Sequence, residues 1–543
     1  MLSIQVKYND NKYTFSKGTT LLEISKSFQK DFKDKIIIGE INGILTELNT
    51  PVMNSCDIRF YDRNSSTGNK VYELGLVFIL VKIFKDRFNK DLKIIHALDK
   101  GIYIRCNDVT EKDLELASKE MNRLIELDLP IDKLLVNRKE AIKYYANQGA
   151  KDKVELLKYN TNTNINLYKF DNMYDYYFYN LPISTGYLKD FKLHYLNENS
   201  FVLLFRSIYN PRLTYKHHEK MFDEFERYYE WCSNMGITSI SNLNRAIIDN
   251  KINDIIMLSE LHQNNELFEI AKDVYNKKSR IVLISGPSSS GKTTTCKKLG
   301  LYLKSFGLTP KSLSIDDYFI SRDETPKRED GSYDFECLGA VDTKLFNKHL
   351  EKLLNGEKIK TPTYNFITGK PEYITDPIEL KENEILLIEG LHALNDELTK
   401  NISDKYKYKI YISPLPILTL DNHNRIKMTD VRLLRRIVRD NESRGYNASD
   451  TLSHWPSVRE GEEKNVFPFQ EEADVVFNTT LIYELSVLKT YAEPLLYAVD
   501  ESDVNYKDVV RLLNLLKLVL PISSENIPRD SVIREFIGNS IFK

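Results

Sequence analysis

One short stretch of the sequence combines glycine, lysine and hydroxyl residues at a spacing that suits phosphate binding. It reads GPSSSGKT and matches G-x-x-x-x-G-K-[ST] at every fixed position. Glycines let backbone N–H groups wrap a phosphate chain, and a following helix N-terminus adds a favourable dipole. We expect the lysine to reach the β- and γ-phosphates and the threonine hydroxyl to bind Mg²⁺. The residues expected to hold a nucleotide are Gly286, Pro287, Ser288, Ser289, Ser290, Gly291, Lys292, Thr293 and Thr294.

The elements on either side of this stretch are those that the pattern requires. Residues 280–285, RIVLIS, form a short apolar, β-branched run that predicts a strand. A helix is expected from Thr294 to Phe306, where Gly307 ends it. A phosphate-binding loop between a strand and a helix predicts nucleotide binding, but it does not choose between an ATPase, a GTPase and a kinase.

Two acidic residues each follow another predicted strand. SLSID ends at Asp316, and EILLIE ends at Glu389. Ligands of open α/β sheets lie at the carboxyl ends of the strands, so both acids should face the phosphates. Asp316 could accept the proton of an attacking hydroxyl or hold a metal ion through water. Glu389 fits a magnesium position, and the expected metal-side set is Thr293, Glu389 and Asp316.

An arginine-rich segment, DVRLLRRIVRDNESR, spans residues 430–444. Arg432, Arg436 and Arg439 are spaced to share one helical face, with Arg435 beside them. Several guanidinium groups with few acidic partners suit the clamping of a phosphate chain by a mobile lid. The alternative is a solvated basic helix.

The composition places these motifs in an ordinary globular chain. At 543 residues three to four domains are expected, and 42% hydrophobic with 28% charged residues argues against wholesale disorder. The net charge of −2 argues against a surface that coats nucleic acid throughout. Five scattered cysteines without a CxxC pair suggest the reducing cytoplasm. The longest apolar run, residues 74–81, is far below the roughly 18 residues of a spanning helix, so no membrane partner is expected.

The N-terminal part divides into two predicted regions. Residues 1–62 show a hairpin turn at Asn9–Asn11 and a helical pattern from Thr20 to Phe32, and their ββαββ order predicts a β-grasp domain. Residues 63–70, RNSSTGNK, are polar and predict a linker. Residues 71–206 predict an α+β domain, with an opening apolar helix and further strands.

The remaining chain changes character twice. Residues 207–279 predict a helical connector, where Ile248, Ile252, Ile255, Ile256 and Leu261 have helical spacing. Residues 280–543 alternate strands with helices. This alternation predicts a doubly wound parallel sheet, so the whole chain should be a multidomain α/β and α+β protein.

Seven segments of the C-terminal region form a recognisable series: GPSSSGKT, SIDDYF, YDFECLGAVD, TPTYNF, LLIEGLHAL, RLLRRIVRD with SRG, and EEADVVFN. On these segments, residues 280 to about 485 resemble the uridine kinase and phosphoribulokinase group. The resemblance implies a doubly wound sheet with a lid, ATP and Mg²⁺ as cofactors, and kinase activity. By position, Asp316 matches the general base. Lys292, Thr293 and Glu389 match the phosphate and magnesium positions, and Arg436, Arg439 and Arg444 match lid arginines around the triphosphate.

The acceptor side departs from the family pattern. Phe335 and Glu336 stand where uridine kinases have Phe-Asp against the sugar hydroxyls, and Tyr364 and Phe366 fall in the base-contacting strip. The family's aspartate, its base-reading histidine and a lid arginine are replaced by Asn365, Gly369 and Tyr446. The expected function is phosphoryl transfer to a nucleoside of the uridine or cytidine type, giving the 5′-monophosphate. A kinase for another sugar or sugar phosphate is the alternative, because losing a polar contact redirects specificity.

The N-terminal half resembles a different family. Residues 1–62 are similar to the TGS domain of threonyl-tRNA synthetases, and residues 71–206 to their second additional, editing domain. The histidine pair of that domain would fall near Tyr72–Leu76, and its Cys/His pair in YNLPISTG, but neither segment holds these residues. The resemblance therefore implies a binding or docking module without editing chemistry. RNA is its implied partner, and an RNA-binding regulator with a nucleotide-sensing loop is a further alternative. Homo-oligomerisation and the choice of ATP over GTP are left open.

Overall fold

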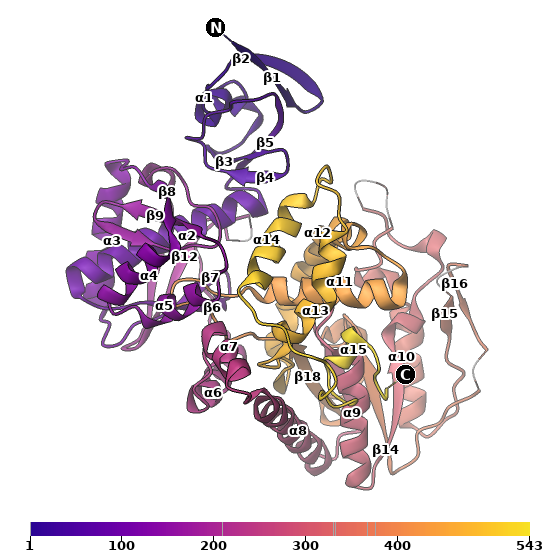
Figure 1. Cartoon of the computed structure of the whole chain (residues 1–543). Coiled ribbons are helices and arrows are strands. Elements are labelled where there is room, and N and C mark those ends of the chain that lie inside the picture. Colours follow the sequence, from indigo (N-terminus) through magenta and orange to yellow (C-terminus); the bar gives the residue numbers. More distant parts are fainter. Residues whose placement is uncertain are drawn as a thin grey trace.

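The computed structural model describes residues 2–208, 210–328, 331, 333–365, 368–374 and 376–542. Figure 1 shows the N-terminal sheet at the top, the middle region at the left and the C-terminal region at the right. Among the described residues, none of the helices combines the length and the apolar character that crossing a bilayer requires.

The N-terminal sheet contains the predicted hairpin. β1 (Ser3–Tyr8) and β2 (Asn11–Ser16) pair antiparallel, and Asn9 and Asp10 turn the chain with φ of 46° and 65°. The predicted helix is shorter than its pattern, because α1 (Leu21–Lys26) gives way to a short 3₁₀ turn. The strand order is β2-β1-β5-β3-β4, with β1 and β5 parallel. The remaining strands are β3 (Ile36–Ile41), β4 (Ile44–Thr46) and β5 (Cys56–Asp62).

The prediction of a linker at residues 63–70 is wrong, because α2 (Ser66–Ile83) begins inside it. The Ser65 side chain caps this helix by accepting from the Gly68 N–H. Gly68 permits a close approach, since a Cβ there would lie 2.0 Å from the Asp62 carbonyl oxygen. Arg63 is also fixed, by ion pairs to Asp34 and Asp190. This polar Gly/Ser segment is therefore the beginning of α2, which packs against the end of β5.

The middle region packs two antiparallel sheets around α2. Their orders are β11-β12-β7-β6 and β10-β9-β8. The helix α3 spans Glu111–Glu126. The other elements are β6 (Lys93–Leu98), β7 (Gly101–Arg105), β8 (Asp132–Asn137), α4 (Arg138–Asn147), α5 (Lys151–Lys158), β9 (Asn164–Phe170), β10 (Met173–Asp175), β11 (Phe191–Asn197) and β12 (Ser200–Phe205).

Three helices connect this region to the C-terminal sheet: α6 (Glu219–Asn234), α7 (Ile240–Ile248) and α8 (Ile252–Asn276). The apolar residues predicted to share helical spacing, from Ile248 to Leu261, do not lie on one helix, because α7 ends at Ile248 and α8 begins at Ile252. Ile255 and Ile256 are buried, whereas Ile248 and Leu261 are exposed.

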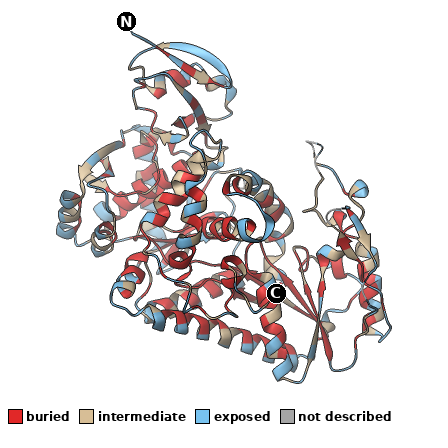
Figure 2. Cartoon of the chain, turned by 45° about the vertical axis from the view of Figure 1, so that its right-hand side comes forward, coloured by how far each residue is buried: buried red, intermediate tan, exposed pale blue. Residues whose placement is uncertain are grey.

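The C-terminal region is a five-stranded parallel sheet in the order β14-β17-β13-β18-β19, as the alternation predicts. In β13, Ile281 and Leu283 join the core under α10, whereas Val282 and Ile284 join the core under α8 and α9. Figure 2 shows this buried sheet between its helices. Its elements are β13 (Ile281–Ser285), α9 (Lys292–Ser305), β14 (Thr309–Ser314), α10 (Thr343–Leu354), β15 (Thr363–Asn365), β16 (Lys370–Glu372), β17 (Glu384–Glu389), β18 (Lys407–Ser413), α11 (Met428–Arg444), α12 (Ala448–Asn465), β19 (Val475–Asn478), α13 (Glu484–Tyr497), α14 (Tyr506–Lys517) and α15 (Arg534–Ile537).

Candidate active site

The glycine-rich stretch forms a loop, residues 286–291, between β13 and α9 (the phosphate loop). Its two glycines are there for separate reasons. A Cβ on Gly286 would lie 2.0 Å from the Ile412 carbonyl oxygen, so only glycine lets the loop pass β18. Gly291 has φ of +88° and starts α9 from a left-handed conformation. The loop therefore leads its backbone into a helix N-terminus, the geometry that binds phosphate groups.

Lys292 folds back over this loop. Its Nζ donates to the carbonyl oxygens of Gly286 at 2.9 Å and Pro287 at 3.1 Å. The surrounding protein lowers the pKa of Lys292, although the carboxylates of Glu389, Glu535 and others act in the opposite direction. The ammonium group is thus held within the loop, in position to meet an incoming phosphate.

Two of the three expected metal-side residues are in contact. The Thr293 hydroxyl donates to the Glu389 carboxylate, with 3.0 Å to Oε1. Burial raises the pKa of Glu389, and Lys292 and Thr293 oppose that shift. Among the described residues no three His, Cys, Asp or Glu side chains gather as a metal-ion site. A hydroxyl with one carboxylate suits Mg²⁺, which keeps several waters and takes further ligands from substrate phosphates.

Asp316 lies one strand away from this pair. The strand β14 ends at Ser314, before the predicted end, and Asp316 follows in a short 3₁₀ turn. β14 pairs with β17 up to Ser314 and Glu389, so both acids lie at the same edge. The Asp316 side chain reaches solvent, yet desolvation by the protein around it raises its pKa, against the pull of Lys292 and Arg444. A carboxylate with a raised pKa is a better proton acceptor.

We expected the arginines of α11 to have few acidic partners, but each of them contacts a carboxylate. Arg432 and Arg435 are fully buried and form ion pairs with Glu462 and Glu484. Arg432 Nε also donates to the Ser288 carbonyl oxygen at 2.9 Å, and Arg435 Nη2 to that of Thr479 at 2.8 Å. These two buried side chains therefore hold the backbone of the phosphate loop in place and are not exposed on a lid.

The other arginines of this helix share one counter-ion. Arg436, Arg439 and Arg444 all contact the buried Asp440 carboxylate, at 3.1, 3.1 and 3.5 Å. Arg436 Nη1 additionally donates to Ser288 Oγ at 2.7 Å, so it already touches the phosphate loop. This arrangement presents three guanidinium groups together while Asp440 partly neutralises their mutual repulsion.

The described residues expected on the acceptor side lie near the short turn that carries Asp316, which β15 contacts. Phe319 contacts the rings of both Phe335 and Tyr364, at 5.8 and 5.5 Å between centroids. Glu336 packs against α12, where a Cβ on Gly461 would lie 2.8 Å from its Cβ. Burial and the charge of Glu462 raise the pKa of Glu336, whereas Arg436 lowers it. Phe366 lies outside the described residues.

Gly369, which stands in place of a base-reading histidine, has no room for a side chain. A Cβ there would lie 2.8 Å from Arg322 Cβ and 2.9 Å from Arg322 Nε. Its φ of +70° also favours glycine, and the Arg322 N–H donates to its carbonyl oxygen at 2.8 Å. An arginine thus fills the position that a longer side chain at 369 would take.

Sequence reasoning missed two acidic residues of this site. Asp440 is spaced four residues from both Arg436 and Arg444, and that spacing was a readable signal of ion pairing. Glu462 accepts from the Ser288 N–H at 2.7 Å and pairs with Arg432. It lies in an acid-rich stretch, GEEK, and no local pattern separates it from Glu460 and Glu463, which are less buried.

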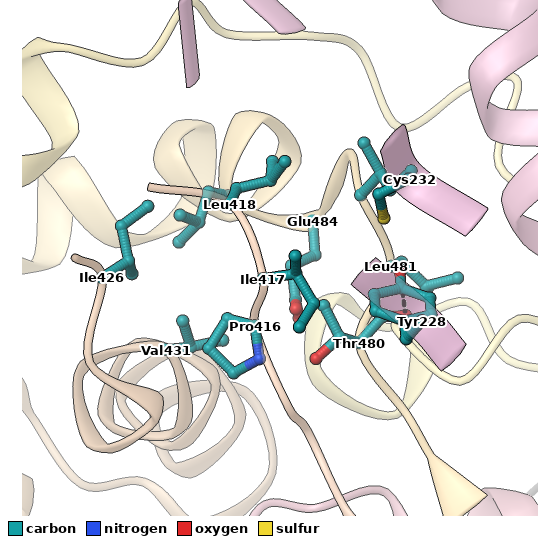
Figure 3. Close-up of a pocket in the computed structure, with 12 residues that line it drawn as sticks. Tyr228, Cys232, Pro416, Ile417, Leu418, Ile426, Val431, Thr480, Leu481 and Glu484 are labelled. Carbon is teal, nitrogen blue, oxygen red and sulfur yellow. Dashed lines mark hydrogen bonds between the residues drawn. The ribbon is translucent and has the colours of Figure 1, made fainter. Parts of the chain in front are cut away.

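A small cavity of about 20 Å³ lies beside Val431 of α11 and Glu484, the partner of Arg435. Figure 3 shows that apolar side chains from segments 416–426 and 480–485 and from α6 line it. Its volume holds about one water molecule, so it is not an acceptor site.

Comparison with known proteins identifies the C-terminal half. A model described as the phosphoribulokinase / uridine kinase family matches residues 281–485. The uridine kinase of Borrelia turicatae is 30% identical over 220 residues, which cover 38% of this chain and 92% of that enzyme. The chain belongs to the phosphoribulokinase / uridine kinase family. Membership of this family supports ATP-dependent kinase chemistry at the phosphate loop.

The N-terminal half matches a different group, which confirms the predicted fusion. Threonine–tRNA ligase of Carboxydothermus hydrogenoformans is 30% identical over 196 residues, which cover 35% of this chain. The chain spans 31% of that ligase's length. Among solved structures, D-glycerate 3-kinase of Cryptococcus neoformans is similar over 36% of this chain and 87% of its own, with a TM-score of 0.25 and 12% identity.

Proposed function

We propose that this member of the uridine kinase family transfers the γ-phosphoryl group of ATP to the 5′-hydroxyl of a nucleoside of the uridine or cytidine type. The observation that carries the proposal is the contact between Thr293 and Glu389, one strand from Asp316 and beside Lys292. A proton acceptor and a phosphate-binding cation at one sheet edge are what phosphoryl transfer to a hydroxyl requires. ATP and nucleosides are cytoplasmic, so we place the enzyme there.

In this proposal each group has a distinct role. Asp316 accepts the proton of the acceptor hydroxyl as that oxygen attacks the γ-phosphorus. Lys292 and the guanidinium groups of Arg436 and Arg439 neutralise the charge on the transferred group. Thr293 and Glu389 are the residues that would hold Mg²⁺, which would supply further charge neutralisation. Most of the rate enhancement then comes from position and electrostatics.

The proposed acceptor contacts come from the aromatic cluster and from Glu336. Phe335 and Tyr364 would stack against the acceptor, and Glu336 would hydrogen-bond its hydroxyls. Phe366 and Arg444 complete the set that we propose, on the acceptor side and the triphosphate side respectively.

A second candidate acceptor is a sugar or sugar phosphate, and Arg322 favours it. The Arg322 side chain lies over Gly369, where uridine kinases would read the base. A guanidinium group there suits a phosphate better than a pyrimidine edge, because it offers paired N–H donors to oxygen anions.

A further candidate concerns the N-terminal half, whose likeness to threonine–tRNA ligases supports RNA binding. In that case a structured RNA should bind the full chain with a steep salt dependence. Binding that persists unchanged from low to moderate salt would count against this partner.

The deciding experiment is ADP release by the purified full chain with Mg-ATP. The acceptor panel holds the common nucleosides, ribulose 5-phosphate and other sugar phosphates, with Lys292→Ala as the control for the site. A signal with uridine or cytidine that Lys292→Ala abolishes supports the nucleoside proposal. A signal with sugar phosphates alone overturns it in favour of the second candidate. Silence across the panel by a protein that still binds ATP removes both.

A further inference from the structure

The C-terminal segment, residues 528–542, crosses the phosphate loop. The Glu535 carboxylate accepts from the backbone N–H of Thr294, with 3.1 Å from nitrogen to Oε2. Thr294 is in the first turn of α9, directly after Lys292 and Thr293. Val532 lies over Gly291, since a Cβ on that glycine would come within 2.5 Å of Val532 Cγ1. In Figure 1 the helix α15 lies close to α9 and α11.

The contact with Thr294 places a negative charge where the nucleotide's phosphates are proposed to bind. The first N–H groups of a helix have no partner within the helix, and the dipole there favours anions. Glu535 acts electrostatically on Lys292, on Glu389 and on Arg439, the groups that should receive the triphosphate. It raises the pKa of Glu389 together with burial, as a phosphate oxygen would. A carboxylate of this chain therefore occupies a backbone N–H that would otherwise be available to a phosphate group.

The segment around Glu535 is held firmly, and it presents this one side chain to the loop. Ile533 and Phe536 are fully buried, and the Arg435 guanidinium lies 5.0 Å from the centre of the Phe536 ring. Asp530 forms an ion pair with Lys298 of α9 at 3.1 Å. Arg534 Nη2 donates to the carbonyl oxygens of Ser524 and Ile527. Glu535 is half-buried between these anchors.

We infer that Glu535 holds the place of a nucleotide phosphate on the Thr294 N–H, and that a bound triphosphate displaces it. The C-terminal segment is then a part of the nucleotide site, and Glu535 sets nucleotide affinity without taking part in phosphoryl transfer. This inference rests on the proposed function, since it requires a nucleotide at the phosphate loop. It assigns a role to residues that lie well beyond the family match at 281–485.

The test is equilibrium binding of a fluorescent ATP analogue with Mg²⁺ and no acceptor, using the full chain. Glu535→Gln keeps the size of the side chain and removes its charge, and Glu535→Ala removes the competing acceptor as well. Both should bind the analogue about three- to thirty-fold more tightly than the wild type, the range expected for one charge at a helix N-terminus. Glu525→Gln is the matched control, because Glu525 is exposed in the same C-terminal region and should leave the Kd unchanged.

Equal Kd values in the wild type and both Glu535 variants overturn the inference alone. Weaker binding by Glu535→Gln also overturns it and makes Glu535 a favourable contact of the nucleotide. No binding by any of these proteins overturns the inference together with the proposed function.

Discussion

At the scale of single residues, the carboxylates of the site differ in what surrounds them. Glu389 is engaged by Thr293, whereas Asp316 reaches solvent at the neighbouring strand end. Desolvation raises the pKa of both groups. The open side chain with a raised pKa is the one suited to receive a proton from an acceptor, and the engaged one is suited to the metal side.

Asp316→Asn should lower kcat by about 10²–10⁴-fold, because the amide cannot accept the hydroxyl proton. The Kd for ATP should stay the same, since Lys292 and the phosphate loop are unaltered. In the wild type, activity should fall at acid pH through a pKa above the ordinary aspartate range, because the base works only when deprotonated. The measurement is a pH profile of kcat alongside nucleotide binding. The exposed Asp323→Asn is the control, and full activity in Asp316→Asn would remove the base assignment.

At the scale of elements, α11 performs two tasks with one arginine-rich stretch. Arg432 and Arg435 point inward and bind the phosphate loop and Thr479 after β19, while Arg436, Arg439 and Arg444 gather around Asp440. The inward pair is fixed by acids of the neighbouring helices α12 and α13. The phosphate loop is thus positioned by α12 through Glu462 as well as by its own glycines.

Glu462→Gln should destabilise the chain and weaken nucleotide binding together. It leaves the Arg432 guanidinium buried without a counter-charge, and removing one partner of a buried pair costs about 3–5 kcal/mol. The measurements are chemical unfolding and titration with an ATP analogue. Glu460→Gln, on the same helix, removes the charge from an exposed pair with Lys464 and should change stability by less than about 1 kcal/mol. Equal effects of the two substitutions would contradict the role of Glu462.

The helix α11 shows how much the sequence could predict. The extent of α11 and the parallel sheet were readable, because they depend on local periodicity and on strand–helix alternation. The partners of Arg432 and Arg435 were not, since Glu462 and Glu484 lie 30 and 49 residues further along the chain. The linker prediction at 63–70 failed for a different reason, because Gly68 allows a close approach to the Asp62 carbonyl oxygen that composition does not reveal.

At the scale of the whole molecule, the segment that leads into α11 forms one of the contacts between the two halves. Residues 414–427 follow β18 and enter the middle region. There Asn424 Nδ2 donates to the Tyr176 carbonyl oxygen at 2.8 Å, and Arg425 pairs with the buried Glu73 of α2 at 2.8 Å. The helix that supports the phosphate loop therefore begins at an interface with the synthetase-like half.

The contact of Glu73 makes the stability of this interface depend on pH in a definite direction. Burial alone would raise the pKa of Glu73, but Arg425 and Lys427 lower it to about 2 from an ordinary value of 4.5. Because the folded state lowers this pKa, the ionised carboxylate stabilises the fold fully above about pH 4.5. That contribution is lost as the pH falls towards 2.

Glu73→Gln should therefore lower the Tm of the full chain most at neutral pH, where it removes the charged partner of a buried arginine. The difference in Tm between wild type and variant should shrink as the pH falls below about 4.5, since protonation then makes the wild type resemble the variant. Thermal unfolding between pH 7 and pH 3 measures it, with the exposed Glu501→Gln as control. A difference that stays constant across this range, or is absent at pH 7, would show that the two halves are not held together by this ion pair.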